Sequence, residues 1–247
     1  MSLFNRYALW PLLFFCHFLA ASLLAWHLLA QIDFGYAWGY QALDIHEHIQ
    51  EMGPLNYYKD DFEHTDYAEH QRLFSEITRG IQNRGEGLAD IQYHLADGTP
   101  EILMRTPEVV HLEDVARLVH HYYWAGSIAA LMFAGLLFYC YRQGLKPPPA
   151  RKVLAILAIL LAVGALTLWL LGPVTVFYWL HEYAFPADNP WFFYYQESLM
   201  TTLMKAPDLF GFIALLLLGA LLPIWGASLA LMVRVLAPRA AGSPKRR

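Results

Sequence analysis

The chain has 247 residues and a formal net charge of −4; 57% of its residues are hydrophobic and 15% are charged. Charged residues make up about a quarter of an ordinary globular domain, so the composition argues against a soluble protein. The acidic balance argues against nucleic acid as a partner, and the two cysteines have no C-x-x-C or zinc-ligand spacing.

Four apolar runs are long enough to cross a bilayer, which requires about 20 residues. We expect transmembrane helices at residues 7–30, 119–141, 153–178 and 208–233. The first run is too long for a signal peptide and its small residues lie in its middle, so we expect an uncleaved anchor. It contains His17 and His27. An ionisable residue inside a membrane segment is a functional candidate, and we rank His27 higher because it lies near the outer end.

Residues 31–118 form a polar segment that is long enough for a small domain. The stretch YQALDIHEHIQEM (40–52) has a loose apolar stripe and predicts a helix that Gly53-Pro54 ends. Residues 60–83 predict a second helix. The stretch IQYHLADGTPEILM (91–104), with two alternating runs around Asp97-Gly98, predicts a short β-hairpin.

A third helix of this segment is expected to begin at Thr106, with Thr106 as N-cap and Pro107 at the first helical position. No helix breaker follows before Gly144, so this helix should continue into the span at 119–141. His111 would then lie about 16 Å before the apolar run, at the height of lipid head groups.

The third span leads into the stretch FYWLHEYAFPADNPWFFYY (177–195), which begins the outer loop 179–207. His181 emerges here among aromatic side chains, Trp191 included, that are typical of a membrane interface. His111 and His181 are therefore expected to share a height at the outer face. Pro223 is expected to kink the last span.

Charge predicts the topology. Lysine and arginine concentrate in the loop 142–152 and in the tail 234–247, whereas all 21 acids lie within residues 33–114 and 182–208. Because short basic loops stay in the cytoplasm, we expect both termini inside. The fold class that follows is an α-helical membrane protein with four transmembrane helices and a small, mostly helical extracytoplasmic domain containing a short β-hairpin.

Two histidines are candidates for acid–base chemistry. Glu108 and Asp114 share the helix face of His111, and either acid could hold one ring nitrogen and orient the other. The alternative for His111 is a solvated or capping residue in a helical first turn. For His181 the alternative is an interfacial residue hydrogen-bonded at a helix end. A zinc-peptidase motif is absent there, because Phe185 stands where H-E-x-x-H requires its second histidine.

Other catalytic and ligand-binding patterns have little support. No G-x-S-x-G elbow or glycine-rich phosphate loop occurs. A patch rich in histidine and acid extends over residues 46–70, and its weak candidates for a divalent metal site are His46, His48, His64 and His70. A charged, solvated face is the commoner explanation of such a patch, so no metal is predicted.

Two stretches resemble the bacterial lipoprotein intramolecular transacylase (Lit) family of integral membrane proteins. They are TPEVVHLEDVARL, before the second span, and LHEYAFPADNPW, after the third. The resemblance covers the four-span plan, the outer domain and this pair of motifs. Residues 46–70 match nothing in the family pattern, which leaves another lipid substrate open.

The resemblance implies an enzyme of the cytoplasmic membrane that needs no cofactor and acts at its outer face. Its substrate would be a diacylated lipoprotein in the outer leaflet, among membrane lipids. The sn-2 acyl chain would move from a diacylglyceryl-cysteine to the α-amino group of that cysteine. The two essential histidines of the family correspond to His111 and His181.

This chemistry suits the residues. An α-amine has a pKa of about 7.7–8.0 and must lose its proton before it attacks an ester, which a histidine base can accept. One histidine would be the base and the other the acid or oxyanion partner, with Asp114 orienting His111, Asn189 donating to the oxyanion, and Trp191 in support. The alternatives are a non-enzymatic membrane sensor or metal-binding module using residues 46–70, and an intermolecular membrane acyltransferase.

Overall fold

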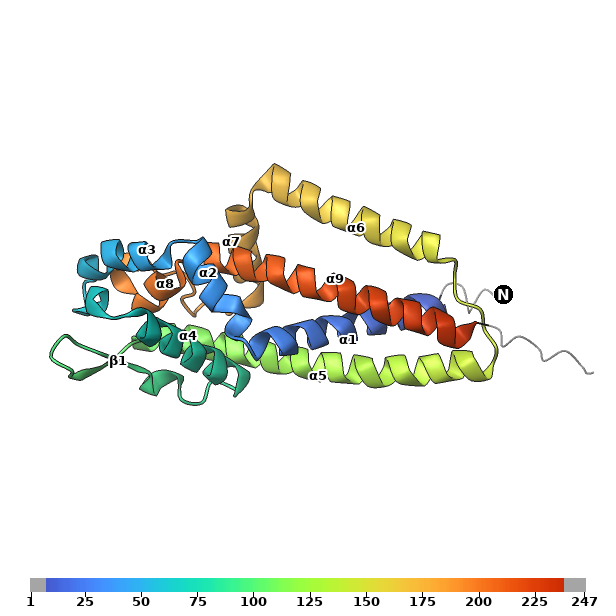
Figure 1. The fold of residues 1–247 in the computed structure, drawn as a ribbon, viewed down its shortest axis with the longest axis horizontal. Helices are drawn as coiled ribbons and strands as arrows, with labels where there is room; N and C mark the ends of the chain where they lie inside the picture. Colours follow the sequence, from blue (N-terminus) through green and yellow to red (C-terminus); the bar gives the residue numbers. More distant parts are fainter. Residues whose placement is uncertain (1–7, 238–247) are drawn as a thin grey trace, which may run out of the picture. The chain divides into compact units, whose positions relative to one another are not determined.

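The computed structural model describes residues 8–237 (Figure 1). Four of its helices are long and apolar enough to cross a membrane: Trp10–Ala30, Thr106–Arg142, Arg151–Leu171 and Asp208–Leu236. Together with a two-stranded sheet, they confirm the expected mostly helical fold with four long apolar helices. The expected start of the first span at residue 7, and the expected basic tail beyond residue 237, lie outside the described residues.

The elements follow one another without large interruptions. The helices are α1 (Trp10–Ala30), α2 (Tyr36–Ala42), α3 (Ile45–Met52), α4 (Tyr67–Gln82), α5 (Thr106–Arg142), α6 (Ala150–Leu171), α7 (Pro173–Ala184), α8 (Leu199–Met204) and α9 (Asp208–Leu236). Short 3₁₀ turns are η2 (Asp33–Gly35), η3 (Gly53–Leu55), η4 (Phe62–His64), η5 (Leu88–Asp90) and η6 (Tyr195–Glu197). The strands are β1 (Gln92–His94) and β2 (Pro100–Ile102).

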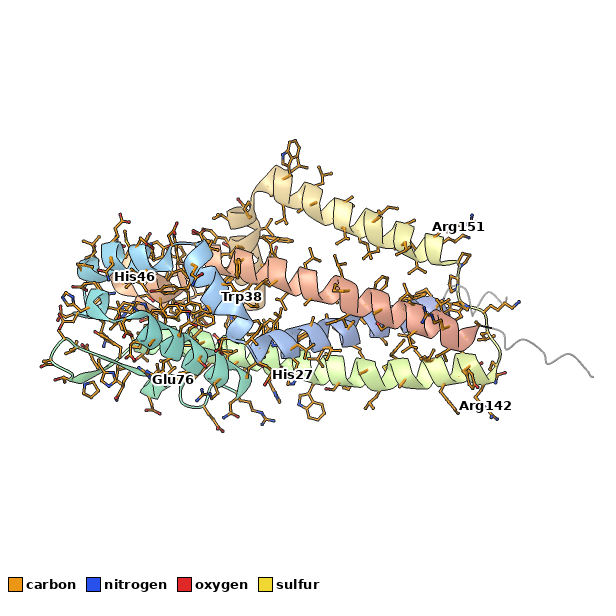
Figure 2. The ribbon with its side chains drawn as sticks, in the orientation of Figure 1. His27, Trp38, His46, Glu76, Arg142 and Arg151 are labelled. Atoms are coloured by element: carbon orange, nitrogen blue, oxygen red, sulfur yellow. The ribbon has the colours of Figure 1, made fainter. Side chains whose placement is uncertain are left out.

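The chain forms two compact units. Within the described residues, the first comprises residues 8–25, 124–165 and 219–237. Its buried core includes Leu13, Cys140, Trp225 and Met232. Gly126 allows α5 to approach α1 closely, because a Cβ atom there would lie 2.7 Å from the side chain of Leu23. The loop between α5 and α6 has Arg142 before it and Arg151 after it (Figure 2).

The second unit comprises residues 26–123 and 166–218. Its core is continuous and its fully buried members include Tyr36, Ile45, Ile49, Phe62, Leu73, Tyr93, Leu103 and Leu203. Tyr36 connects three helices, since its ring stacks on Phe74 of α4 with 4.1 Å between centroids and its hydroxyl donates to the Leu203 carbonyl of α8 at 2.9 Å.

The polar segment folds much as predicted, with two differences. The helix expected over residues 40–52 is interrupted at Asp44, whose φ of 51° is left-handed, so α2 and α3 are separate helices. The helix expected over residues 60–83 begins only at Tyr67, because the Asp66 side chain accepts a hydrogen bond from the Glu69 amide at 2.8 Å and caps the helix there. The predicted hairpin is confirmed: β1 pairs antiparallel with β2 around Gly98, which has a φ of 85°.

The predicted helix from Thr106 into the second span is also continuous; α5 extends to Arg142 and is followed by Gly144 with a φ of 62°. The run expected as one span over 153–178 is not one helix. Gly172 has a φ of 80° and Pro173 follows it, so α6 ends at Leu171 and α7 begins anew. Proline cannot donate to the preceding turn, and this break gives His181 a helix of its own.

Candidate active site

The first turns of α5 hold His111 in a buried position. The His111 side chain is 8% exposed, and Glu108, one turn earlier, is 1% exposed. The Glu108 carboxylate accepts hydrogen bonds from the amide and guanidinium of Arg105 and from the hydroxyl of Ser198, the N-cap of α8. A buried carboxylate requires such partners, and these contacts attach the start of α5 to α8.

His181 lies in the last turn of α7. Its Nδ1 is 2.8 Å from the carbonyl oxygen of Phe177, one turn earlier. A carbonyl can only accept, so Nδ1 carries the hydrogen and donates it. In the neutral ring Nε2 then has a free lone pair and is the nitrogen able to accept a proton.

The two histidine rings lie together, as expected for a shared site. Their centroids are 6.2 Å apart with an angle of 35° between the planes. Phe185 packs edge-on against His111 with 4.9 Å between centroids, and Trp191 lies 5.1 Å from His181. The rings are therefore held mainly by aromatic packing.

Asp114 and Asn189 lie close to the pair, but in a different arrangement from the one expected. The Asp114 carboxylate, 5% exposed, accepts hydrogen bonds from the Arg117 guanidinium and, at 2.6 Å, from the side-chain amide (Nδ2) of Asn189. Nδ1 of His111 is buried and has no hydrogen-bond partner among the described residues. Asp114 therefore connects α5 to the loop after α7 and does not orient the His111 ring directly.

A cavity of about 790 Å³ opens at the histidine pair. His111, His181 and Trp191 contribute to its wall, and the remainder is mainly apolar and aromatic, from the end of α1, η2, α4, α5, α7, α8, the start of α9 and the segment between α7 and α8. This volume is in the range of sites that enclose small ligands, and the lining suits hydrocarbon more than a polar metabolite.

Electrostatics keeps His181 neutral. Partial burial lowers the pKa of the His181 imidazole, and the hydrogen bond to the Phe177 carbonyl opposes that shift without cancelling it. Burial favours the neutral ring because the charged form loses hydration. The ring is thus able to accept a proton at neutral pH, which suits a general base.

The histidines of residues 46–70 do not converge on one point. His46 lies on α3 at the surface (Figure 2) and, like His70, contacts the Tyr40 hydroxyl. His48 is buried with its ring edge-on to Tyr195, 4.4 Å between centroids. His64 alone among these four joins a group with ligand-like spacing, where its ring nitrogen and the carboxylates of Asp61 and Glu63 lie within 4.8 Å of one another.

His17 and His27 of α1 do not line the cavity at the histidine pair. His17 of α1 is 2% exposed, stacks on Phe133 with 4.8 Å between centroids, and contacts the Ser228 hydroxyl at 2.6 Å. His27 contacts the Tyr123 hydroxyl at 3.1 Å. These contacts give both residues a structural role, because His17 connects α1 to α9 and His27 connects α1 to α5.

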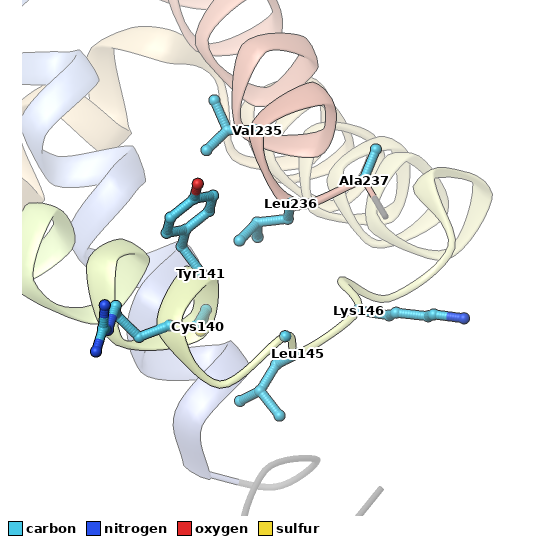
Figure 3. A pocket seen from close by; sticks show the side chains of 9 residues that line it. Cys140, Tyr141, Leu145, Lys146, Val235, Leu236 and Ala237 are labelled. Atoms are coloured by element: carbon cyan, nitrogen blue, oxygen red, sulfur yellow. The ribbon is translucent and has the colours of Figure 1, made fainter. Parts of the chain in front are cut away.

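A second cavity, of about 430 Å³, lies in the first unit between the end of α5 and the end of α9 (Figure 3). Its wall includes Cys140, Leu145 and Leu236. Lys146 also lines this second cavity, and its ammonium group extends away from Leu145 (Figure 3). The titratable residues in the wall of this second cavity are Cys140, Tyr141, Arg142 and Lys146, and no histidine or carboxylate is among the described residues that line it.

Sequence reasoning missed several contributors to the site. Ser198 and Arg117 partner the buried acids, while Phe177 supplies the carbonyl that sets the His181 tautomer. Arg117 could have been found, since it stands three residues after Asp114 on a helix. Ser198 could not, because 90 residues separate it from Glu108.

Comparison with known proteins finds one family match. Residues 11–206 match the sequence model of a family described as lipoprotein intramolecular transacylase Lit. No curated protein and no solved structure matches the chain. The matched range contains both histidines, the segment between them and the loop after α7 as far as residue 206.

Proposed function

Because the chain belongs to the lipoprotein intramolecular transacylase (Lit) family, we propose that it transfers the sn-2 acyl chain of a diacylglyceryl-cysteine to the α-amino group of the same cysteine. The product is an N-acylated lyso-lipoprotein. The observation that carries this proposal is the pair of His111 and His181 rings at the wall of one apolar cavity, 6.2 Å between centroids.

His181 is the base in this proposal. Its Nδ1 donates to the Phe177 carbonyl, which leaves the Nε2 lone pair to take a proton from the substrate α-amine. The neutral amine nitrogen attacks the ester carbonyl carbon, a C–N bond forms, and the nitrogen passes this proton to Nε2 as its positive charge develops. His111 acts as the acid or oxyanion partner on the other side of the reacting carbon.

The second half of the reaction breaks the ester. The tetrahedral intermediate collapses, the bond between the carbonyl carbon and the sn-2 oxygen breaks, and that oxygen receives a proton. The proton taken from the amine and the proton given to the alcohol balance, so no water, metal or acyl donor is consumed. Since both reacting groups belong to one molecule, holding them close supplies much of the acceleration.

The topology expected from charge completes the proposal. With both termini in the cytoplasm, the second unit and its cavity lie at the outer face of the cytoplasmic membrane. Lipoprotein substrates in the outer leaflet would then present their ester bonds at the depth of the aromatic residues around His181.

Mass spectrometry of lipoproteins from cells with and without this protein tests the reaction. We expect an N-acyl-S-monoacylglyceryl cysteine only in cells that contain it. A triacylated cysteine, in which the glyceryl group keeps both chains, would instead identify an intermolecular acyltransferase. Unchanged lipoproteins would contradict both activities.

A further inference from the structure

One wall of the large cavity forms a continuous apolar track that begins at His111. On α5, residues His111, Val115 and Leu118 all line the cavity. Their spacing of four and three residues places them on one helix face. At 1.5 Å per residue, the seven positions from His111 to Leu118 extend about 10 Å along the helix.

Helix α4 presents a matching stripe to the same cavity. Ile77 and Ile81, four residues apart, both line it. The turn after α4 lies against α5, since a Cβ atom at Gly85 would be 3.2 Å from Glu113, two residues after His111. The apolar faces of α4 and α5 therefore bound the same space, and His111 is the first residue along α5 that lines it.

Trp26 bounds the cavity beyond Leu118. It lines the cavity, and its indole packs edge-on against Tyr122, one turn of α5 past Leu118, with 5.9 Å between centroids. It also packs against Phe34 with 4.8 Å between centroids. Because the Trp26 indole packs against both Tyr122 and Phe34, its position at this part of the cavity wall is fixed.

We infer that this track, from His111 past Val115 to Leu118 and Trp26, holds the migrating acyl chain and selects its length, which makes Val115 a specificity-determining residue. The inference rests on the proposed transfer reaction. The occupant is the sn-2 chain because its carbonyl carbon must lie at the histidines, so its first methylenes begin where the track begins.

Purified full-length protein and synthetic diacylglyceryl-cysteine lipopeptides provide the test. The sn-1 chain is palmitoyl throughout, and the sn-2 chain is either octanoyl or palmitoyl. In Val115→Phe we expect the palmitoyl rate to fall about fourfold for each methylene displaced from the track, the equivalent of the ~0.8 kcal/mol of burying one CH₂. The octanoyl rate should fall by less, because fewer of its methylenes lie beyond Val115, and a measurable octanoyl rate also shows that the variant is folded.

Val174→Phe is the matched control, because Val174 is a 48% exposed valine of the same unit that does not line the cavity. It should not change the ratio of palmitoyl to octanoyl rates. Exchanging the chains, with octanoyl at sn-1 and palmitoyl at sn-2, should leave Val115→Phe as slow as with palmitoyl at both positions.

Three results would overturn the inference: equal slowing of both substrates, discrimination by the sn-1 chain, or the same change in Val174→Phe. If Val115→Phe is not recovered folded, Leu118→Phe and Val115→Ala decide, and an unchanged rate ratio in both contradicts the track. A wild-type protein that converts neither lipopeptide would contradict the transfer reaction itself, which is a different outcome.

Discussion

Two pairs of histidines in the second unit have almost the same distance between their rings but differ in their hydrogen-bond partners and in their position relative to the large cavity. The ring centroids of His46 and His70 are 6.4 Å apart, and those of His111 and His181 are 6.2 Å apart. The first pair shares the Tyr40 hydroxyl, whereas the second lies at the wall of the large apolar cavity.

The hydrogen bonds explain the difference. The Thr65 hydroxyl donates to the Phe62 carbonyl, so it accepts from His70 Nε2 at 2.7 Å, and His70 Nδ1 accepts from the Tyr40 hydroxyl at 2.8 Å. Both nitrogens of His70 are thereby used. In His181 only Nδ1 forms such a bond, to the backbone carbonyl of Phe177. A nitrogen that is still available, next to a space for substrate, distinguishes a reactive histidine from a structural one.

The largest expected effect is the loss of the reactive pair. His111→Ala or His181→Ala should lower the transfer rate by about 10²–10⁴-fold, the usual contribution of a general acid or base. Conversion of a diacylglyceryl-cysteine lipopeptide, followed by mass spectrometry, measures it. His46→Ala is the control and should retain activity; wild-type turnover by either pair variant would remove the distinction between the two pairs.

Loss of the contact between α5 and the loop should have the next largest effect. Asp114→Ala removes the acceptor of Asn189 and of Arg117, and should lower kcat by about tenfold to a hundredfold, from the ~1.5–3 kcal/mol of a hydrogen bond to a charged group. Asn189→Ala should have a similar effect, and the double variant little more than either single one. The neighbouring Glu113→Gln is the control; additive effects would show that the two residues act independently.

The pH profile should report the substrate amine more than His181. Because the pKa of His181 is lowered, its neutral form persists below the usual histidine range, and the base is not lost as pH falls through 6.5. The rate should instead fall about tenfold per pH unit below the amine pKa of about 7.7–8.0. Measurement of kcat/KM from about pH 5 to pH 9 checks this; a plateau from pH 7 downward to pH 6.5 would contradict it.

His70, of the pair His46 and His70, should lower the free energy of unfolding in acid. Burial lowers the pKa of His70 from 6.5 to about 4, so the unfolded chain binds more protons than the folded one between these values. Stability is complete above pH 6.5 and is lost as pH falls, by about 2 kcal/mol at about pH 5. Thermal unfolding of the wild type and of His70→Phe, each above pH 6.5 and at about pH 5, measures this loss. The variant should lose less stability on acidification.

The smallest expected effect is that of chelation. The group of Asp61, Glu63 and His64 is half-buried to exposed and lies outside the cavity wall. Treatment with EDTA, or His64→Ala, should leave the transfer rate unchanged. A loss of rate that divalent metal restores, and that His64→Ala reproduces, would favour the metal-binding alternative.

Much of this architecture follows from local properties of the chain. The apolar runs, the Thr106-Pro107 start and the Asp97-Gly98 turn each act over a few residues, and the structure confirms the helices and the hairpin that they predict. Errors arose where local signals compete. The break at Gly172-Pro173 lies inside a long apolar run, and Asp44 interrupts an amphipathic pattern that would otherwise continue.

The sequence by itself determined which runs are long and apolar enough to cross a membrane, which segments are polar, and that His111 and His181 are the candidate pair. Only the tertiary structure decided what surrounds them. Asp114 pairs with Asn189 across 75 residues, and Ser198 with Glu108 across 90, and no helical or strand period connects positions so far apart. A hydrogen bond depends on distance in space, so the free nitrogen of His181 and the apolar track beside it become visible only after the helices pack.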